Sequence, residues 1–238
     1  MRVRKYGSTG VRSGGMARPG RLLAAAAMWG VAACHTGDAP PSTPVRGDAA
    51  AAQTAAAAWS SNPLAGDALA AAGDSMTIET GPHTILWPAG AKELAPPYTV
   101  RATFTKHRGR LHEGYGILFG GSGLQGPEAG QVYSYLLVRG DGSFLVKRRQ
   151  GMQTPVVRDW TQSPVIRRDV DEQGRPNELE VAVTDSVTVF RVNGTEVARV
   201  PSAELSVRGL AGVRTSHECL LVVRDFRVEP GAAGGAAR

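Results

Sequence analysis

The side chains best suited to ligand chemistry are tyrosines and cations that recur in the middle of the chain. The set comprises Tyr115, Tyr133, Tyr135, Arg139, Lys147 and Arg149. Aromatic rings pack against the faces of sugar rings, and cationic groups donate hydrogen bonds to sugar oxygens. In β-strands, alternation would place Tyr133 and Tyr135 on one strand face, and the Lys147 and Arg149 pair on one face of the next strand. The two pairs form one ligand-binding surface if the strand register aligns them; otherwise the tyrosines belong to the core and the cations to a solvated rim.

Carboxylates are the second group with chemical potential, because glycoside hydrolysis uses two of them about 5–9.5 Å apart. The acidic residues of interest are Glu113, Glu128, Asp141, Asp159, Glu178 and Glu180. The last two alternate with Leu179 and Val181, which favours an outward, solvated strand face over a catalytic groove. We therefore predict no catalytic residue and expect a binding protein rather than an enzyme.

A loop in the second half of the chain matches the ligand spacing of a calcium-binding EF-hand loop. Asp169, Asp171, Gln173, Gly174 and Glu180 fall at positions 1, 3, 5, 6 and 12 of that template. No helical pattern flanks the loop, and Pro176 interrupts it. A polar connection between strands is therefore the favoured interpretation, with a calcium site at Asp169, Asp171 and Gln173 as the alternative. No other metal or cofactor is predicted.

The elements that carry these residues are predicted to be β-strands. Residues 98–104 alternate strictly between apolar and polar types, which is typical of a strand with one buried face. Further strands are expected at 114–120, 131–139, 143–149, 178–183, 186–192, 195–200 and 220–228. Gly140-Asp141-Gly142 and Asn193-Gly194 are predicted hairpin turns. This pattern predicts an all-β protein, a two-sheet antiparallel jelly-roll sandwich over residues 74–230, with 231–238 as a disordered tail.

The N-terminal region is predicted to be an export signal followed by a tether. An apolar run that follows arginines and ends in small residues predicts a signal peptide over residues 1–33. Val31-Ala32-Ala33-Cys34 resembles a bacterial lipobox, which implies cleavage before Cys34 and lipidation of that cysteine. His35 follows, and by resemblance to lipoprotein sorting rules this residue favours the outer membrane. Residues 34–73, rich in alanine and proline, are predicted to be a flexible tether.

The charge of the mature chain excludes one class of partner. The full sequence has 27 basic and 21 acidic residues, a net charge of +6. Six of the basic residues and none of the acidic ones lie in 1–33, so the mature chain is balanced. We exclude nucleic-acid binding on this ground, because that function relies on an excess of positive charge. With Cys34 lipidated, Cys219 is a lone cysteine in an apolar run and is predicted to be buried.

The order of short motifs along the predicted domain resembles the concanavalin A-like (laminin-G-like) jelly-roll domains of bacterial extracytoplasmic proteins. The motifs lie at 114–121, 133–139, 141–142, 147–149, 159–161, 177–179 and 189–194. The similarity extends to domains of the 3-keto-disaccharide hydrolase type, and it implies a jelly roll that binds a carbohydrate or cleaves a modified disaccharide. The sequence lacks the Glu-x-Asp-x-x-Glu strand typical of glycanases with this fold, which favours binding.

These features together predict a lipid-anchored protein of the bacterial cell envelope, on the periplasmic side or the surface. Its expected partner is a carbohydrate or envelope glycan, and its contact with the membrane is expected through the N-terminal lipid only. A hydrolase acting on a 3-keto-glycoside type of disaccharide is the first alternative. A protein-interaction or structural envelope domain is the second.

Overall fold

Two antiparallel sheets of seven strands each make up the computed structural model, which describes residues 59–62, 68–170 and 174–231. The front sheet has the order β1 (Trp59–Asn62), β4 (Ile85–Pro88), β13 (Leu210–Thr215), β6 (Tyr115–Ser122), β7 (Val132–Val138), β8 (Ser143–Gln150) and β9 (Val156–Gln162). The back sheet has the order β12 (Thr195–Pro201), β11 (Val187–Val192), β10 (Asn177–Val183), β5 (Tyr98–Arg108), β14 (Cys219–Pro230), β3 (Ser75–Thr80) and β2 (Ala68–Ala72). The predicted jelly-roll sandwich is confirmed.

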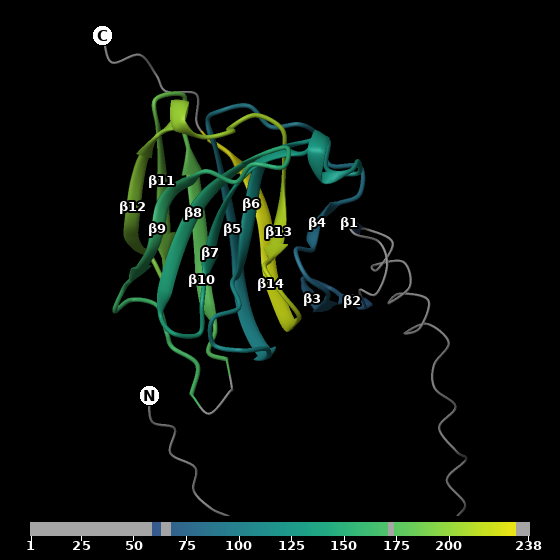
Figure 1. Ribbon diagram of the computed structural model, residues 1–238, viewed down its shortest axis with the longest axis vertical. Helices are drawn as coiled ribbons and strands as arrows, with labels where there is room; N and C mark the ends of the chain where they lie inside the picture. The colour runs from purple at the N-terminus through teal and green to yellow at the C-terminus, as the bar shows by residue number, and fades with distance from the viewer. Residues whose placement is uncertain (1–58, 63–67, 171–173, 232–238) are drawn as a thin grey trace, which may run out of the picture. The chain divides into compact units, whose positions relative to one another are not determined.

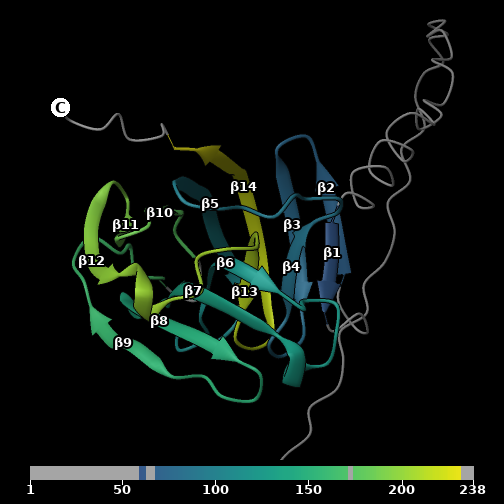
Figure 2. The same cartoon turned by 90° about the horizontal axis from the view of Figure 1, so that it is seen from above.

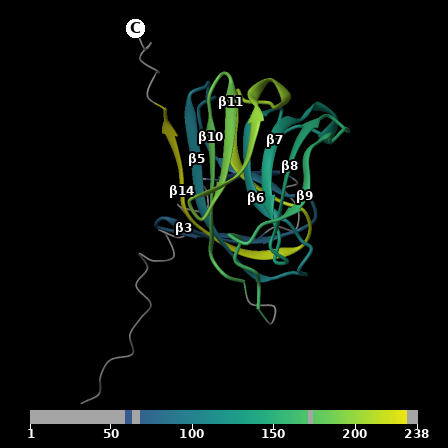
Figure 3. The same ribbon diagram turned by 90° about the vertical axis from the view of Figure 1, so that its left-hand side faces the viewer.

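The front sheet faces the reader in Figure 1, and Figure 3 shows the two sheets as separate layers. Seen from above, β1 and β4 lie beside β2 and β3 at one side of the sandwich, and β9 lies near β12 at the other (Figure 2). Two short 3-10 turns, η1 (Glu128–Gly130) and η2 (Ser202–Glu204), connect strands. In the part of the chain described here, no helix combines the length and the apolar character needed to cross a bilayer.

The core between the sheets is built from alternate residues of the strands. The predicted inward face of β5 is confirmed, because Tyr98, Val100, Ala102 and Phe104 are all buried in the core cluster. Ile117 of β6 and Leu136 of β7 belong to the same cluster and come from the front sheet. Removal of this apolar surface from water is the main term that holds the two layers together.

The sandwich begins earlier in the chain than predicted. β1 pairs with β4, and β2 pairs with β3, so residues 59–62 and 68–72 belong to the sheets. The Trp59 ring packs edge-on against Phe226 at 5.0 Å. The predicted end of the tether at residue 73 is therefore wrong. Alanine-rich segments have little strand propensity of their own, but the edge of a formed sheet supplies backbone partners that composition does not reveal. Residues 1–58, with Cys34 and the predicted leader, lie outside the described residues.

Both predicted hairpin turns are present. Asn193 and Gly194 join β11 to β12 with φ angles of +50° and +80°, as a type I′ turn requires. The Asn193 amide also fixes neighbouring loops, because its Nδ2 donates to the Val165 carbonyl at 2.7 Å and its Oδ1 accepts from the Glu178 amide at 3.0 Å. Asp141 fixes the β7–β8 turn by accepting the Ser143 backbone N–H at 3.0 Å.

We expect Asn193→Ala to lower the free energy of unfolding by about 2–3 kcal/mol, because it removes hydrogen bonds to three groups and strains a positive φ. Gly194→Ala is the matched control. Nothing lies within 4 Å of a Cβ atom at that position, so this variant measures backbone strain alone, about 1 kcal/mol. Urea unfolding followed by tryptophan fluorescence measures both. Equal losses in the two variants would contradict a role for the Asn193 side chain.

Candidate functional site

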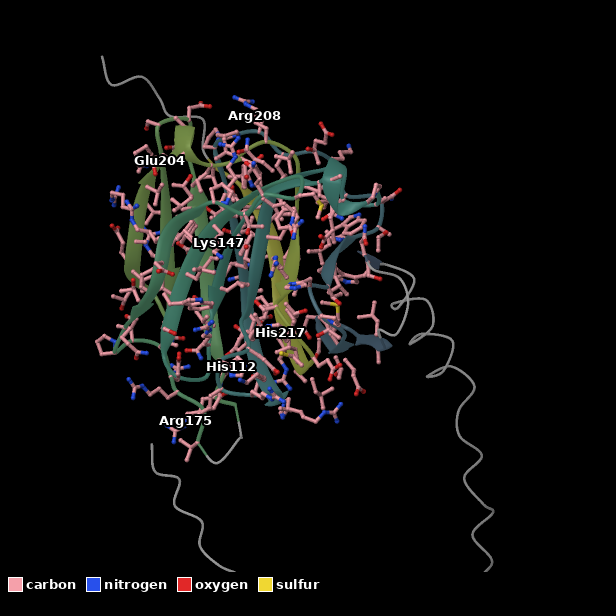
Figure 4. The ribbon with its side chains drawn as sticks, viewed as in Figure 1. His112, Lys147, Arg175, Glu204, Arg208 and His217 are labelled. Atoms are coloured by element: carbon pink, nitrogen blue, oxygen red, sulfur yellow. The ribbon has the colours of Figure 1, made fainter. Side chains whose placement is uncertain are left out.

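The front sheet carries a second cluster of buried side chains on its outer face, the face turned away from the back sheet. Its buried members are Ile85, Trp87, Leu118, Leu124, Tyr133, Tyr135, Leu137 and Leu145, with Trp160 and Leu210 partly buried against them. Lys147 projects over the middle of this face in Figure 4. The outer face of the front sheet is therefore an ordered surface built on aromatic rings, and it is the candidate site.

Strand register aligns the predicted residues of β7 and β8. Tyr133 lies opposite Arg149, and Tyr135 lies opposite Lys147. Directly opposite residues of an antiparallel pair point to the same face. The four side chains therefore share the outer face, which sequence alternation could not decide. Tyr133 and Tyr135 are only 1% and 3% exposed, so their rings form the floor of the site rather than its accessible surface.

The Tyr133 hydroxyl is the shared acceptor of two arginines. Arg149 Nε donates to it at 3.1 Å, and Arg214 Nε donates at 3.3 Å. The Arg214 guanidinium also lies 4.3 Å from the centre of the Tyr135 ring, a cation–π contact. Both arginines are buried. The sequence does not reveal Arg214 as a site residue, because the segment Leu210–Thr215 (LAGVRT) lacks the alternation of apolar and polar residues that marks a strand.

Arg139 and Trp160 form a second cationic and aromatic pair on the same face. The guanidinium carbon of Arg139 lies 3.4 Å from the centre of the Trp160 ring. Burial lowers the pKa of Arg139. A glycine at position 114 leaves room for the ring, because a Cβ there would lie 3.1 Å from Trp160 Cη2. Trp160 thus adds a partly buried aromatic surface to the site. It lies beside Arg139, and of these two residues Arg139 was the predicted ligand contact.

Tyr115 does not belong to the site, and its prediction as a ligand contact is wrong. Its side chain is fully buried in the core between the sheets, with its ring 5.9 Å from that of Phe104. Burial, followed by the charge of Asp169, raises the pKa of its hydroxyl. The cause is strand phase: Tyr115, Ile117 and Phe119 all point inward from β6.

Hollows lie at two ends of the candidate site. One, of about 380 Å³, is lined by Trp87, Leu124, Leu210 and the loop around Gly126. The Asn62 amide fixes that loop by donating to two of its carbonyls at 2.7 and 2.8 Å. The other, of about 240 Å³, is lined by polar side chains: Arg110, His112, Glu113, His217 and Glu218, together with Pro82. His112 and His217 mark this lower end in Figure 4.

His83 lies between the polar hollow and the arginine pair. Its ring is 5.6 Å from that of His217. Burial, then the positive charges of Arg214 and His217, lower the pKa of His83, while Glu128 opposes the shift. Burial and nearby cations both disfavour the protonated form of an imidazole, and burial is the larger of the two causes here.

The carboxylates singled out by sequence do not gather on this face. Glu180 forms ion pairs with Arg101 and Arg191, on strands of the back sheet. Asp141 caps a turn, and Asp159 accepts the Trp160 backbone N–H at 2.8 Å. Glu180 points outward as predicted, but its side chain is only 12% exposed and is ion-paired rather than solvated.

The described residues of the alternative calcium site do not come together as a group of metal ligands. The Asp169 carboxylate forms an ion pair with Lys106 at 2.8 Å, and both side chains are 1% exposed. Glu180 is held by two arginines. Asp171 and Gln173 lie outside the described residues. Within residues 59–62, 68–170 and 174–231, no group of three or more His, Cys, Asp or Glu side chains could hold a metal ion.

The lone cysteine of the domain is buried, as predicted. Cys219 is 2% exposed. Burial, followed by the charge of Glu113, raises the pKa of its thiol to about 12. A thiol with so high a pKa stays protonated at neutral pH and is a poor nucleophile.

We expect Asp169→Ala to cost about 3–5 kcal/mol of unfolding free energy, because it leaves the Lys106 ammonium buried without its counter-ion. The double variant Lys106→Met/Asp169→Ala should recover part of that loss, since it removes the unpaired charge. Urea unfolding of the wild type and the two variants measures the difference. A single variant as stable as the wild type would contradict the buried ion pair.

Comparisons with known proteins bear on the fold. No protein-family model and no curated protein matches the sequence. The carbohydrate-binding module CBM66 from Bacillus subtilis superposes with a TM-score of 0.57, covering 72% of this chain and 95% of its own, at 10% identity. A protein of unknown function with a galectin-like fold, also from Bacillus subtilis, gives a TM-score of 0.54, 75% and 92% coverage and 13% identity. The chain thus shares its β-sandwich fold with these two proteins.

Proposed function

We propose that this protein is a non-catalytic carbohydrate-binding module whose binding surface is the outer face of the front sheet. The observation that carries the proposal is the register of β7 and β8, which aligns two tyrosines with two cations on one face. Trp160 and Arg139 extend that surface. Aromatic rings beside fixed hydrogen-bond donors are what recognition of a sugar ring and its oxygens requires.

The residues divide into a floor and a contact layer. Tyr133, Tyr135 and Leu137 are buried, and the two tyrosines contact the arginines. Trp160, Arg139 and Lys147 are half-buried, so parts of these side chains reach the surface. A ligand on this face would contact the part of the Trp160 ring that Arg139 leaves uncovered, and it would receive hydrogen bonds from the two cations. The carbohydrate-binding module among the solved structures with this fold supports the same assignment.

The proposal is for binding without catalysis. Hydrolysis of a glycosidic bond needs two carboxylates across the bond. In the seven described strands of the front sheet, Asp159 is the one acidic residue. These strands therefore do not supply the pair on which the hydrolase alternative depends, and Glu128 at the rim is paired with Arg149.

A glycan array probed with the mature protein, with and without calcium, tests the proposal. We expect binding to at least one glycan. Trp160→Ala should weaken that binding by about tenfold, equivalent to about 1.4 kcal/mol, because it removes the exposed aromatic surface. Arg199→Ala is the control, since Arg199 lies on the back sheet and pairs with Glu196. The proposal fails if no glycan binds, or if the two variants lose affinity equally.

We further propose that Cys34 carries the lipid that anchors this module in the bacterial envelope, with the outer membrane as its destination. The support is the lipobox-like Val31-Ala32-Ala33-Cys34 and the histidine that follows it. Since the sandwich begins at Trp59, residues 35–58 connect it to the lipid. A chain of that length extends to at most about 80 Å. The binding face would therefore remain close to the membrane.

Metabolic labelling with palmitate tests the anchor. We expect labelled protein in the membrane fraction for the wild type, and loss of both label and membrane retention for Cys34→Ala. Cys219→Ala is the control, because the Cys219 thiol is buried and should not be acylated. Label that persists in Cys34→Ala would overturn the proposed attachment.

A further inference from the structure

We propose that the ligand of the outer face is an acidic glycan, bound through a carboxylate, sulfate or phosphate group on the sugar. This inference rests on the proposed function and names the chemical class of its ligand. It is carried by the charge and the hydrogen-bonding character of the face.

The two sheets differ in charge. The seven front-sheet strands contain five basic residues and one acidic residue. The seven back-sheet strands contain seven basic and six acidic residues. On the back sheet the charges pair with each other, as Arg108 does with Glu79 and Arg227 with Glu229. Among the described front-sheet strands, three of the five basic residues lie on the outer face: Lys147, Arg149 and Arg214. Arg148 alternates with the first two and points the other way, and Arg158 donates to the Arg199 carbonyl of the back sheet.

The cations of the outer face are held mainly by neutral groups. Arg149 donates to the Tyr133 hydroxyl and to the Gly151 carbonyl at 3.0 Å. Arg214 donates to the same hydroxyl and to the Thr215 carbonyl at 3.1 Å. These acceptors fix the guanidinium groups but do not neutralise them. The Glu128 carboxylate lies 3.4 Å from Arg149 Nη1 and is 48% exposed at the rim. The negative charges of Asp141 and Asp159 act on Arg139.

Some N–H groups of these cations have no hydrogen-bond acceptor within the described part of the protein. Among the described residues, Lys147 Nζ and Arg214 Nη2 have no hydrogen-bond or ion-pair partner. Arg139 Nε is a buried donor without one. Lysine and arginine offer donors and no acceptors. A neutral sugar presents hydroxyls that both donate and accept, whereas an oxyanion presents acceptors alone. Arg214 is 4% exposed and Arg139 Nε is buried, so Lys147 is the donor of the three that a ligand reaches most directly. A cationic donor of this kind matches an oxyanion better than a neutral sugar.

The closeness of Arg149 and Arg214 is an electrostatic reason to expect an anionic ligand. Arg149 and Arg214 share one acceptor atom, so two positive groups lie close together in a buried setting. An anion above this pair would relieve the repulsion between like charges. Lys147, opposite Tyr135 and half-buried, is the cation best placed to contact the anion directly.

Calorimetric titration of the mature protein tests the inference. It compares the affinities for matched acidic and neutral polysaccharides at low and at moderate salt. The pairs are oligogalacturonate against its carboxyl-reduced form, dextran sulfate against dextran, and a phosphomannan against mannan. We expect at least one acidic member to bind at least about tenfold more tightly than its neutral partner, with affinity falling as salt rises. Inorganic sulfate, inorganic phosphate and galacturonate monomer serve as free-anion arms and should bind more weakly than the polymers.

Substitutions at Lys147 separate charge from structure. Lys147→Gln should reduce affinity for the acidic member by at least about fivefold, and Lys147→Glu by more, while leaving the neutral member unaffected. Arg227→Gln is the control, because Arg227 lies on the back sheet beside Glu229. Thermal unfolding of each variant checks that the fold is retained.

The outcomes distinguish this inference from the proposed function. If a neutral polysaccharide binds as tightly as its acidic partner, the acidic class is wrong and the carbohydrate-binding function stands. If free sulfate, phosphate or galacturonate binds as tightly as the polymers, the site recognises an anion rather than a glycan, and the inference is overturned. If nothing binds here and nothing binds on the array, both fail.

Discussion

One phenol oxygen organises the outer face of the front sheet. Tyr133 on β7 accepts hydrogen bonds from Arg149 on β8 and from Arg214 on β13. Since β6 lies between β7 and β13, this single hydroxyl joins four neighbouring strands into one surface. Burial of a guanidinium group costs free energy unless its donors are satisfied. The hydroxyl, two backbone carbonyls and the Tyr135 ring satisfy part of these donors without cancelling their charge.

The two sheets differ in how their charged side chains are paired. On the back sheet, the charges of Glu180 are divided between Arg101 and Arg191, and the outer face needs no further partner. On the front sheet, an apolar and aromatic floor lies beneath cations that have few counter-ions. Charge kept unpaired over buried aromatic rings is expensive in isolation and becomes favourable when a ligand supplies the missing anion.

The fold alone does not assign a function, because jelly-roll sandwiches serve many purposes. The functional argument therefore rests on the site. Carbohydrate recognition needs a ring to stack on and directed polar groups, and the Trp160, Arg139 and Lys147 layer offers both. The sandwich that carries this layer begins at Trp59 rather than after residue 73.

The sequence by itself determined the β-class, eight of the strands and both hairpin turns, because alternation and turn chemistry are local properties. It also determined that Tyr133 and Tyr135 share a face, as do Lys147 and Arg149. Only the tertiary structure decided that these pairs face the same way, that Tyr115 points inward instead, and that Arg214 joins them from a strand far along the chain. It likewise placed the alanine-rich edge strands and the buried partner of Asp169. The physical reason is the same in each case: register, edge pairing and ion pairing are contacts between segments distant in sequence, and no local pattern encodes them.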